Sequence, residues 1–214
     1  MPHNFDSWKR FSDVFLSMTL LVALPPLILL TALAVRVMLG PPVLFLQERA
    51  GRAGAPFKII KFRSMPSAEQ KRDEFRSGLA MRAIRTLGLD ELPQLWNVLR
   101  GEMSLIGPRP LFVRYVDRYS TFERRRLEVR PGITGWAQVN GRNDLEWERQ
   151  FALDVWYVDN RSFKLDALIF LRTIGVLLSP RAHRERRERP EFTGSDPRTS
   201  AEAEQAVKRN SMGK

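Results

Sequence analysis

The chain has 214 residues and a net charge of +11, contains no cysteine, and has only two histidines, His3 and His183. This composition argues against a disulfide framework, thiolate chemistry, a metal site built on histidines and a Ser-His-Asp triad. Acid–base or nucleophilic chemistry must therefore rely mainly on carboxylates. The basic surplus indicates a partner that carries phosphate, with nucleic acid, anionic lipid and a nucleotide substrate as the candidates.

The first predicted element is an uncharged run over residues 14–35, interrupted near its middle by Pro25 and Pro26. An unbroken helix of this length would be roughly 33 Å long at about 1.5 Å per residue, which is enough to span a bilayer. The two prolines should bend or break it. Both flanks are basic, and the positive-inside rule places both in the cytoplasm. We therefore predict a re-entrant membrane hairpin over residues 1–40, with a kinked single span or a buried core helix as alternatives.

Two strands are predicted next, over residues 43–49 and 56–64, around a turn that contains Gly51 and Gly54. Residues 66–77 are polar, which indicates a loop with a short helix.

A predicted helix then carries two adjacent carboxylates, Asp90 and Glu91, at its start. Its apolar face, at helical spacing, consists of Leu92, Leu95, Trp96 and Leu99. Pro93 fits only a first turn, and Gly101 is a natural C-terminal stop. We therefore expect Asp90 or a neighbour at the N-cap, where exposed N–H groups and the helix dipole favour negative charge.

The following half of the chain is predicted to be largely helical. Helices are expected over residues 111–129, from 143 to about 157, and over 163–179, with Gly- and Pro-rich loops at 101–110 and 131–143. The last helix suits an interfacial position on a bilayer, with an ordinary core helix as the alternative. Arg124, Arg125 and Arg126 are expected to form a solvated or membrane-facing patch.

Four motifs occur in order along the chain. They are KFRSM at residues 61–65, LDELPQL at 89–95, MSLIGPRP at 103–110 and RPGITGWAQVNGRN at 130–143. Together, and behind a proline-broken apolar segment, they resemble the bacterial sugar transferase family, the monotopic phosphoglycosyl transferases, over about residues 5–178. The resemblance implies transfer of sugar-1-phosphate from a UDP-sugar to polyprenol (undecaprenyl) phosphate, with release of UMP. This would be the first membrane step of glycoconjugate assembly, at the cytoplasmic face of the inner membrane.

The resemblance also assigns roles to residues. It implies that Asp90 is the nucleophile, forming a covalent aspartyl–phosphosugar intermediate, and that Asp90 and Glu91 hold Mg2+. Arg85 is expected near the lipid phosphate. The other candidates for substrate binding are Arg109, Gln138, Asn140, Arg142, Lys61 and Arg63, of which Gln138, Asn140 and Arg142 belong to the region that helps hold the nucleotide. Lys61 and Arg63 have an alternative role, in lining a strand or meeting anionic lipid.

The chemistry of these residue types agrees with that assignment. A carboxylate cannot approach a pyrophosphate unaided, because both are negatively charged, so Mg2+ and arginines must neutralise the phosphates first. Mg2+ commonly takes one or two carboxylates, with waters and substrate phosphates completing its shell. Covalent catalysis then divides the transfer into two easier steps.

The predicted fold class is α+β, mainly helical, with the membrane hairpin, a small β-hairpin and interfacial amphipathic helices. Residues 1–40 are assigned to the hairpin and residues 41–180 to a cytoplasmic catalytic domain on the membrane surface. Residues 181–214 are assigned to a disordered charged tail, dispensable for catalysis, because they are poor in large apolar residues.

Two other functions compete with the enzyme. A non-enzymatic protein that binds anionic lipid explains the charge and the hairpin but not the Asp-Glu dyad. A nucleic-acid-binding domain explains the charge, yet the long apolar run and the lack of a recognition motif argue against it, so no nucleic acid partner is expected. The sugar is not named by the sequence, although residues 137–143 resemble members that use N-acetylated sugars.

Overall fold

The computed structural model describes residues 2–65, 74–141, 145–178 and 190–196, together with 201, 202, 204, 205 and 207. The chain divides into two compact units, each built from three separate stretches. Unit 1 comprises Met1–Gln47, Lys58–Gly101 and Gly175–Arg184, and unit 2 comprises Glu48–Phe57, Glu102–Ile174 and Glu185–Lys214. The fold is mainly helical, as the sequence predicts. It contains two small two-stranded sheets, of which one is the expected hairpin and the other was not predicted.

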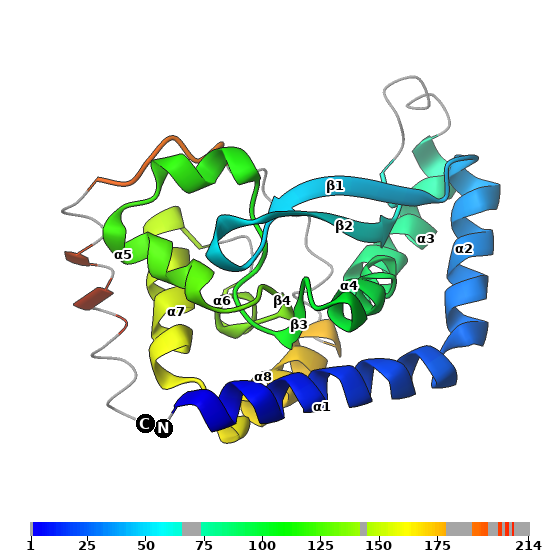
Figure 1. Cartoon of the computed structure of the whole chain (residues 1–214). Coiled ribbons are helices and arrows are strands. Elements are labelled where there is room, and N and C mark those ends of the chain that lie inside the picture. The colour runs from blue at the N-terminus through cyan, green and yellow to red at the C-terminus, as the bar shows by residue number, and fades with distance from the viewer. Residues whose placement is uncertain are drawn as a thin grey trace. The chain divides into compact units, whose positions relative to one another are not determined.

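In unit 1, helices α1 (Pro2–Ala23) and α2 (Pro25–Leu39) meet at a bend of 68° (Figure 1). The N–H of Leu24 still donates to the carbonyl four residues earlier at 2.9 Å, so the break comes directly after it. Pro25 and Pro26 take the first positions of α2, where a missing N–H costs no helical hydrogen bond. Within the described residues no single helix meets the length and hydropathy criteria for a membrane span, but this bent pair meets them jointly. The bend is compatible with the predicted re-entrant hairpin.

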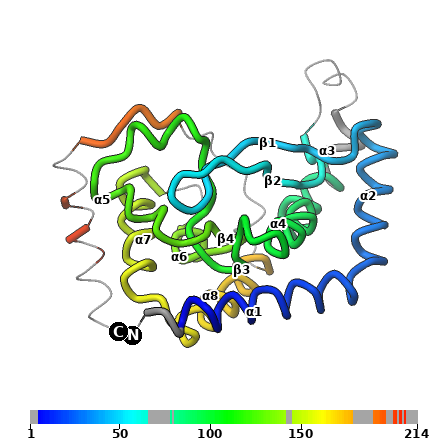
Figure 2. The backbone as a smooth tube through the Cα atoms, in the orientation of Figure 1, coloured from blue at the N-terminus to red at the C-terminus, as the bar shows by residue number. Residues whose placement is uncertain are grey.

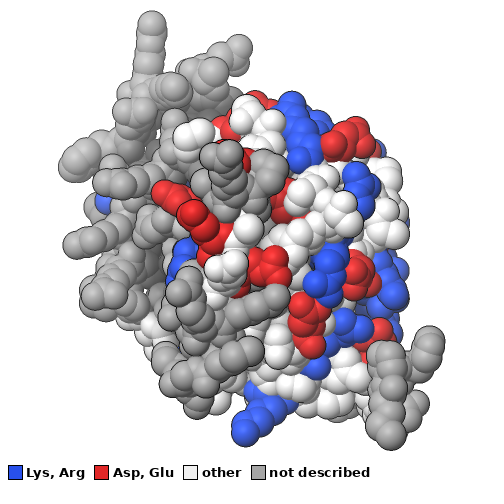
Figure 3. Space-filling model, turned by 90° about the vertical axis from the view of Figure 1, so that its left-hand side faces the viewer, with Lys and Arg blue, Asp and Glu red and all other residues white. Residues whose placement is uncertain are grey.

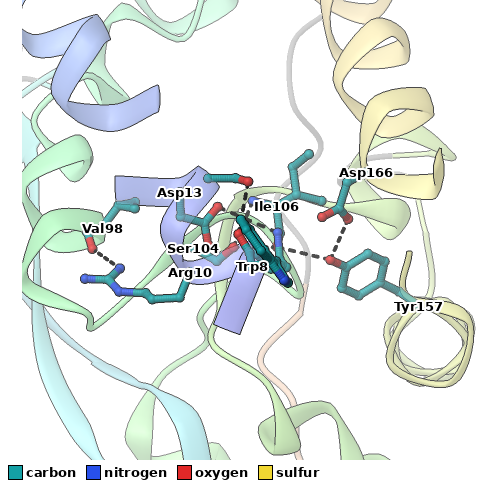
Figure 4. Close-up of polar contacts among 10 residues, drawn as sticks. Trp8, Arg10, Asp13, Val98, Ser104, Ile106, Tyr157 and Asp166 are labelled. Carbon is teal, nitrogen blue, oxygen red and sulfur yellow. Dashed lines mark hydrogen bonds and ion pairs between the residues drawn. The ribbon is translucent and has the colours of Figure 1, made fainter. Parts of the chain in front are cut away.

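Helix α1 is attached to α4 (Gln94–Arg100) by Arg10. Its guanidinium donates to the carbonyl oxygens of Val98 at 2.6 Å and Leu99 at 2.9 Å (Figure 4). The last carbonyls of a helix lack intrahelical partners and carry the negative end of its dipole, so a cation is favoured there.

The predicted strands are confirmed as β1 (Leu44–Ala50) and β2 (Pro56–Phe62), which pair as a hairpin. The tight loop between them contains Ala53 and Gly54, both with positive φ (57° and 80°), and stands out in Figure 2. A glycine adopts this left-handed conformation at little cost.

The buried side of α4 differs from the predicted apolar face. Trp96 is 54% exposed, whereas Asn97 is fully buried. The Asn97 amide accepts the N–H of Ile60 at 3.0 Å and donates to the carbonyl oxygen of Lys58 at 2.8 Å, both on β2. A polar residue thus joins the helix to the strand, which periodicity alone could not reveal.

Unit 2 holds the elements that follow α4 along the chain. They are β3 (Ser104–Ile106), η4 (Val113–Arg118), α5 (Thr121–Arg124), η5 (Arg125–Glu128), β4 (Gly132–Thr134), α6 (Trp136–Val139), α7 (Trp147–Asn160) and α8 (Phe163–Leu178), whose last turn belongs to unit 1. The predicted helices near 143–157 and 163–179 are confirmed as α7 and α8.

The prediction of one helix over residues 111–129 is wrong. Tyr119 and Ser120 are extended, and the Ser120 side chain accepts the N–H of Glu123 while the Glu123 carboxylate accepts that of Ser120. This capping box starts a new short helix and prevents a continuous one.

An aromatic cluster forms much of the core of unit 2. Its rings belong to Tyr115, Tyr119, Trp147, Phe151 and Phe192. Phe192 is 1% exposed and lies 5.0 Å, centroid to centroid, from Phe151. Residues 190–196 belong to the segment 181–214 that the sequence predicts as a disordered tail, and the burial of Phe192 gives them one apolar anchor in this core. Residues 181–189, 197–200, 203, 206 and 208–214 lie outside the described residues.

The expected arginine patch is also only partly correct. Arg125 forms an ion pair with Asp159 that is open to solvent, but Arg126 is 3% exposed. Lys and Arg side chains are interspersed with Asp and Glu on the face shown in Figure 3, the pattern of a solvated surface. Arg126 instead belongs to the interior of unit 2, where it contacts a signature motif.

Candidate active site

The Asp-Glu dyad occupies a single 3-10 turn, η3 (Leu89–Glu91), directly after the left-handed Gly88 (φ 69°). The expectation of Asp90 at the helix N-cap is wrong, because α4 begins only after Pro93. Pro93 has no N–H to offer the carbonyl of Leu89, which accepts the N–H of Leu92 at 3.4 Å instead. The dyad therefore precedes the helix by one tight turn.

The Asp90 carboxylate is held in unit 1 by the KFRSM motif. Asp90 is 7% exposed, and its Oδ2 accepts a hydrogen bond from Ser64 Oγ at 3.0 Å. The guanidinium of Arg85 in turn donates to the carbonyl oxygen of Ser64. Ser64 thus connects the predicted nucleophile with the arginine predicted to meet the lipid phosphate. Sequence reasoning missed Ser64 as a site residue, although it lies inside a quoted motif.

The packing around the dyad comes from three helices of unit 1. Leu89 packs against a cluster that includes Val35 and Leu39 of α2 and Met81 and Ile84 of α3 (Glu74–Thr86). On the other side, a Cβ added at Gly88 would lie 3.8 Å from Leu177 of α8. The dyad turn is therefore fixed by apolar contacts from segments far apart in the sequence.

Two of the predicted binding residues have structural contacts in unit 1. The Arg63 guanidinium donates to the carbonyl oxygens of Leu39 and Gly40 at the end of α2, the latter at 2.6 Å. Arg63 thereby caps the C-terminal end of α2, a structural role that the sequence did not predict. The Lys61 ammonium lies 5.1 Å from the ring centroid of Phe45 across the hairpin, a cation–π geometry.

In unit 2, the GPRP and PGITG motifs are interlocked through their backbones. Strand β3 ends directly before the GPRP motif, and strand β4 lies within the PGITG motif. The two strands pair in parallel. The N–H of Gly107 donates to Thr134 and the N–H of Gly132 to Pro108, both at 2.9 Å. A Cβ on Gly132 would lie 2.1 Å from the Gly107 nitrogen, and one on Gly135 2.1 Å from the Gly107 oxygen. Only glycine permits this approach, so residues predicted as two loops form one rigid platform.

Arg109 projects from this platform in an electropositive environment. The half-buried guanidinium of Arg49 stacks over Phe112 at 3.9 Å and donates to the Pro110 carbonyl at 3.4 Å. Burial, and then the positive charge of Arg109 and more weakly that of Arg114, lower the pKa of Arg49 to about 10. Two cations that repel each other favour an anion beside them. The sequence signal for Arg49, a basic residue at the end of a strand, was too common to single it out.

Gln138 lies within helix α6, and Asn140 follows its last residue. The Gln138 side-chain nitrogen donates to Ile133 at 3.3 Å, while its Oε1 is buried with no hydrogen-bond partner among the residues described. Asn140 donates to Trp136 at 2.8 Å and accepts from Arg172 at 3.4 Å. Arg142 lies outside the described residues. The structure thus places Lys61, Arg63, Arg85, Asp90 and Glu91 in unit 1 and Arg109, Gln138 and Asn140 in unit 2.

The donor set of the dyad fits a magnesium site that a substrate completes. Asp90 and Glu91 offer carboxylate oxygens on adjacent residues, the ligand type that Mg2+ prefers. Across the part of the chain that the structure describes, no three His, Cys, Asp or Glu side chains gather into a closed metal site. Such an open set suits an ion that shares its shell with phosphate oxygens and water.

Comparison with known proteins identifies the class. Residues 5–180 match the family described as bacterial sugar transferase. The chain therefore belongs to the bacterial sugar transferase family and is an enzyme of that class, which confirms the resemblance drawn from the four motifs.

Three relatives show how the match extends. The uncharacterized sugar transferase EpsL of Bacillus subtilis is 48% identical over 175 residues, covering 79% of this chain and 87% of the relative. The UDP-glucose:undecaprenyl-phosphate glucose-1-phosphate transferase of Caulobacter vibrioides is 41% identical over 189 residues, covering 81% and 71%. The UDP-N-acetylgalactosamine-undecaprenyl-phosphate N-acetylgalactosaminephosphotransferase of Aeromonas hydrophila is 41% identical over 184 residues, covering 80% of this chain but 44% of the relative.

Proposed function

We propose that the chain transfers sugar-1-phosphate from a UDP-sugar to polyprenol phosphate and releases UMP. One observation carries the proposal: the buried Asp90 carboxylate is hydrogen-bonded by Ser64, whose carbonyl oxygen holds Arg85. An oriented carboxylate beside an arginine suits attack on a phosphate. Two relatives bear names for transfers from UDP-sugars to undecaprenyl phosphate.

The reaction proceeds in two displacements at one phosphorus atom. An Asp90 carboxylate oxygen forms a bond to the phosphorus that carries the sugar, the pyrophosphate P–O bond breaks, and UMP leaves with the bonding electron pair. An oxygen of polyprenol phosphate then attacks the same phosphorus and releases the Asp90 carboxylate. Each step exchanges one P–O bond for another, so no redox partner is required.

Charge neutralisation is the main task of the surrounding residues. Within unit 1, Arg85 offers a positive charge to a phosphate oxygen. Within unit 2, Arg109 and Arg49 offer positive charge in the same way. Mg2+ held by Asp90 and Glu91 would lower the negative charge of the pyrophosphate. The buried Gln138 Oε1 offers an acceptor to a donor on the nucleotide.

The membrane hairpin supports the lipid half of the reaction. The acceptor phosphate lies at the headgroup level, so a re-entrant α1–α2 segment would hold the dyad at the cytoplasmic surface of the inner membrane. Exposed apolar residues on both helices suit lipid contact, among them Trp8, Phe11, Phe15, Leu29 and Leu33. The sugar stays open, because the relatives' names differ between glucose and N-acetylgalactosamine.

The test uses the full chain in purified membranes with undecaprenyl phosphate, Mg2+ and a panel of UDP-sugars. With the lipid phosphate present, we expect repeated turnover with at least one sugar, measured as UMP released well beyond the amount of protein, and a lipid-linked sugar phosphate as the product. Without the lipid, UMP release should stop at about one UMP per protein. Without the lipid, mass spectrometry should find a sugar phosphate on the peptide that contains Asp90. No UMP with any sugar, from membranes that contain folded protein, would leave lipid binding as the better reading.

A further inference from the structure

The carbonyl oxygens of the GPRP loop and of the residues on either side of it accept a series of hydrogen bonds. The oxygens and their donors are Ile106 with the Tyr157 hydroxyl at 3.2 Å (Figure 4), Pro108 with the Gly132 N–H at 2.9 Å, Pro110 with Arg49 at 3.4 Å and Leu111 with the Ala50 N–H at 2.9 Å. The carbonyl oxygen of Arg109 itself accepts from Arg126 Nη2 at 2.6 Å, a charge-assisted hydrogen bond. The loop therefore has little freedom except in its side chains.

Arg126 makes this bond from a buried position. Its Nε and Nη2 donate to Asp154 Oδ2 of α7 at 3.1 Å and 2.9 Å, and its Nη1 donates to the Tyr119 hydroxyl at 3.2 Å. Burial opposes the charge of Arg126, but Tyr119 and Asp154 outweigh it and raise the pKa of Arg126 above its usual value. The guanidinium therefore stays charged throughout the physiological range.

One nitrogen of Arg126 thus joins two partners, the Asp154 carboxylate on α7 and the Arg109 carbonyl in the loop. The planar fork of arginine makes this possible, whereas a lysine ammonium on a shorter stem could keep Asp154 but not the full set. The immediately preceding Arg125 forms its ion pairs with the exposed side chains of Asp159 and Glu128, so it offers a matched control.

We propose that Arg126 is a positioning residue that sets the Arg109 side chain for the phosphate of the UDP-sugar. The proposal rests on the proposed function. In this arrangement Asp154 on α7 holds the Arg126 guanidinium, and the guanidinium in turn fixes the carbonyl oxygen of Arg109. A small shift of the Arg109 side chain would lower the affinity for the UDP-sugar more than it would lower the stability of the protein.

The test compares Arg126→Lys with Arg125→Lys in the full chain. We expect Arg126→Lys to raise the KM for the UDP-sugar about tenfold, the scale of one charge-assisted hydrogen bond, with kcat changed less than threefold. Arg125→Lys should leave both constants unchanged. The thermal unfolding midpoint should fall only slightly in either variant. Wild-type protein without activity would refute the proposed function, whereas an active wild type with an unchanged KM in folded Arg126→Lys would refute this inference alone.

A double variant separates positioning from general stability. If Arg126 acts through Arg109, then Arg126→Lys should not raise KM further in an Arg109→Ala background. Additive increases would overturn the proposal. If Arg126→Lys does not fold, the pair Arg126→Met with Asp154→Leu removes both buried charges together, an exchange that cores often tolerate. This folded variant should also show a raised KM, and a normal KM in it would count against the role of Arg126.

Discussion

Ser64 Oγ donates to Asp90 Oδ2 at 3.0 Å across 26 residues of sequence. The bond ties the end of the β-hairpin region to the dyad turn, and both residues are buried. One carboxylate oxygen is thereby oriented while the other is left to other partners. A substitution of Asp90 should therefore reduce turnover more than a substitution of Ser64.

Asp90→Asn is expected to abolish turnover, because an amide does not attack phosphorus and carries no negative charge. Ser64→Ala should retain activity but at a reduced kcat, by about tenfold, since it removes one orienting hydrogen bond worth ~1.4 kcal/mol. Initial rates of UMP release measure both effects. Asp90→Asn activity above about a tenth of wild type would remove Asp90 from the nucleophile role.

Activity is expected to depend on a hard divalent cation. Excess EDTA should stop UMP release, and Mg2+ or Mn2+ should restore it, because the dyad offers only carboxylate oxygens. Glu91→Gln should raise the Mg2+ concentration needed for half-maximal rate. Full turnover in EDTA, after dialysis of the membranes, would contradict a metal-dependent mechanism.

Gly132→Ala is expected to destabilise unit 2 by more than about 2 kcal/mol, as overpacking does when neither side can move. Its new Cβ would lie 2.1 Å from the backbone nitrogen of Gly107. The matched control is Gly175→Ala in α8, where a Cβ meets nothing within 4 Å. Alanine should be neutral or stabilising there by up to about 1 kcal/mol. Thermal unfolding in detergent compares the two, and equal midpoints would show that the interlocked backbones can separate cheaply.

Phe192→Ala is expected to cost about 3–5 kcal/mol of stability, because the side chain is buried in the aromatic cluster. The neighbouring Thr193 is exposed, so Thr193→Ala should change stability little. A chain ending at residue 180 lacks Phe192 and should likewise unfold at lower temperature, although the tail is predicted to be dispensable for catalysis. The measurement is the unfolding midpoint, with turnover at low temperature as a check on the folded fraction. A truncated chain as stable as the full one would contradict the stabilising role of Phe192.

Both ends of the α1–α2 segment are expected on the same side of the membrane. The chain has no cysteine, so Asn4→Cys gives a single label site. Membrane-impermeant maleimide should not react with it in intact cells. Replacing Pro25 and Pro26 by Leu should allow a continuous helix and expose the label outside. Labelling of Asn4→Cys without the proline changes would exclude the re-entrant hairpin.

The elements with local signals could be predicted from the sequence. The proline break, the hairpin with its Gly51 and Gly54 turn, and helices α7 and α8 follow from periodicity and turn residues. The start of α4 could not be predicted. Pro93 has no N–H, so the Leu89 carbonyl accepts the N–H of Leu92 instead and closes a 3-10 turn before α4 begins. The tail could not be predicted either, since the cluster that receives Phe192 comes from segments more than 35 residues earlier.

The candidate site shows the same division. Asp90 and Glu91 were visible as a dyad among motifs, but the partner of Asp90 was hidden, because a serine 26 residues away gives no periodic signal. Arg126 was predicted at the surface because runs of arginine usually are solvated, and only its Asp154 partner on α7 explains its burial. Arg63, which stays a candidate for substrate binding, also bonds the end of α2, a contact that the sequence did not reveal. Contacts that depend on tertiary structure were therefore the ones that the sequence concealed.

The discontinuity of the units affects the order in which the protein can mature on the ribosome. Unit 1 holds the dyad, but Leu177, which packs near Gly88, is translated almost ninety residues later. A nascent chain that has released Asp90 from the exit tunnel therefore lacks part of the packing around it. Chain growth thus delays completion of the packing around the dyad until α8 is made, so a polypeptide that terminates before α8 would lack the Leu177 contact at this turn.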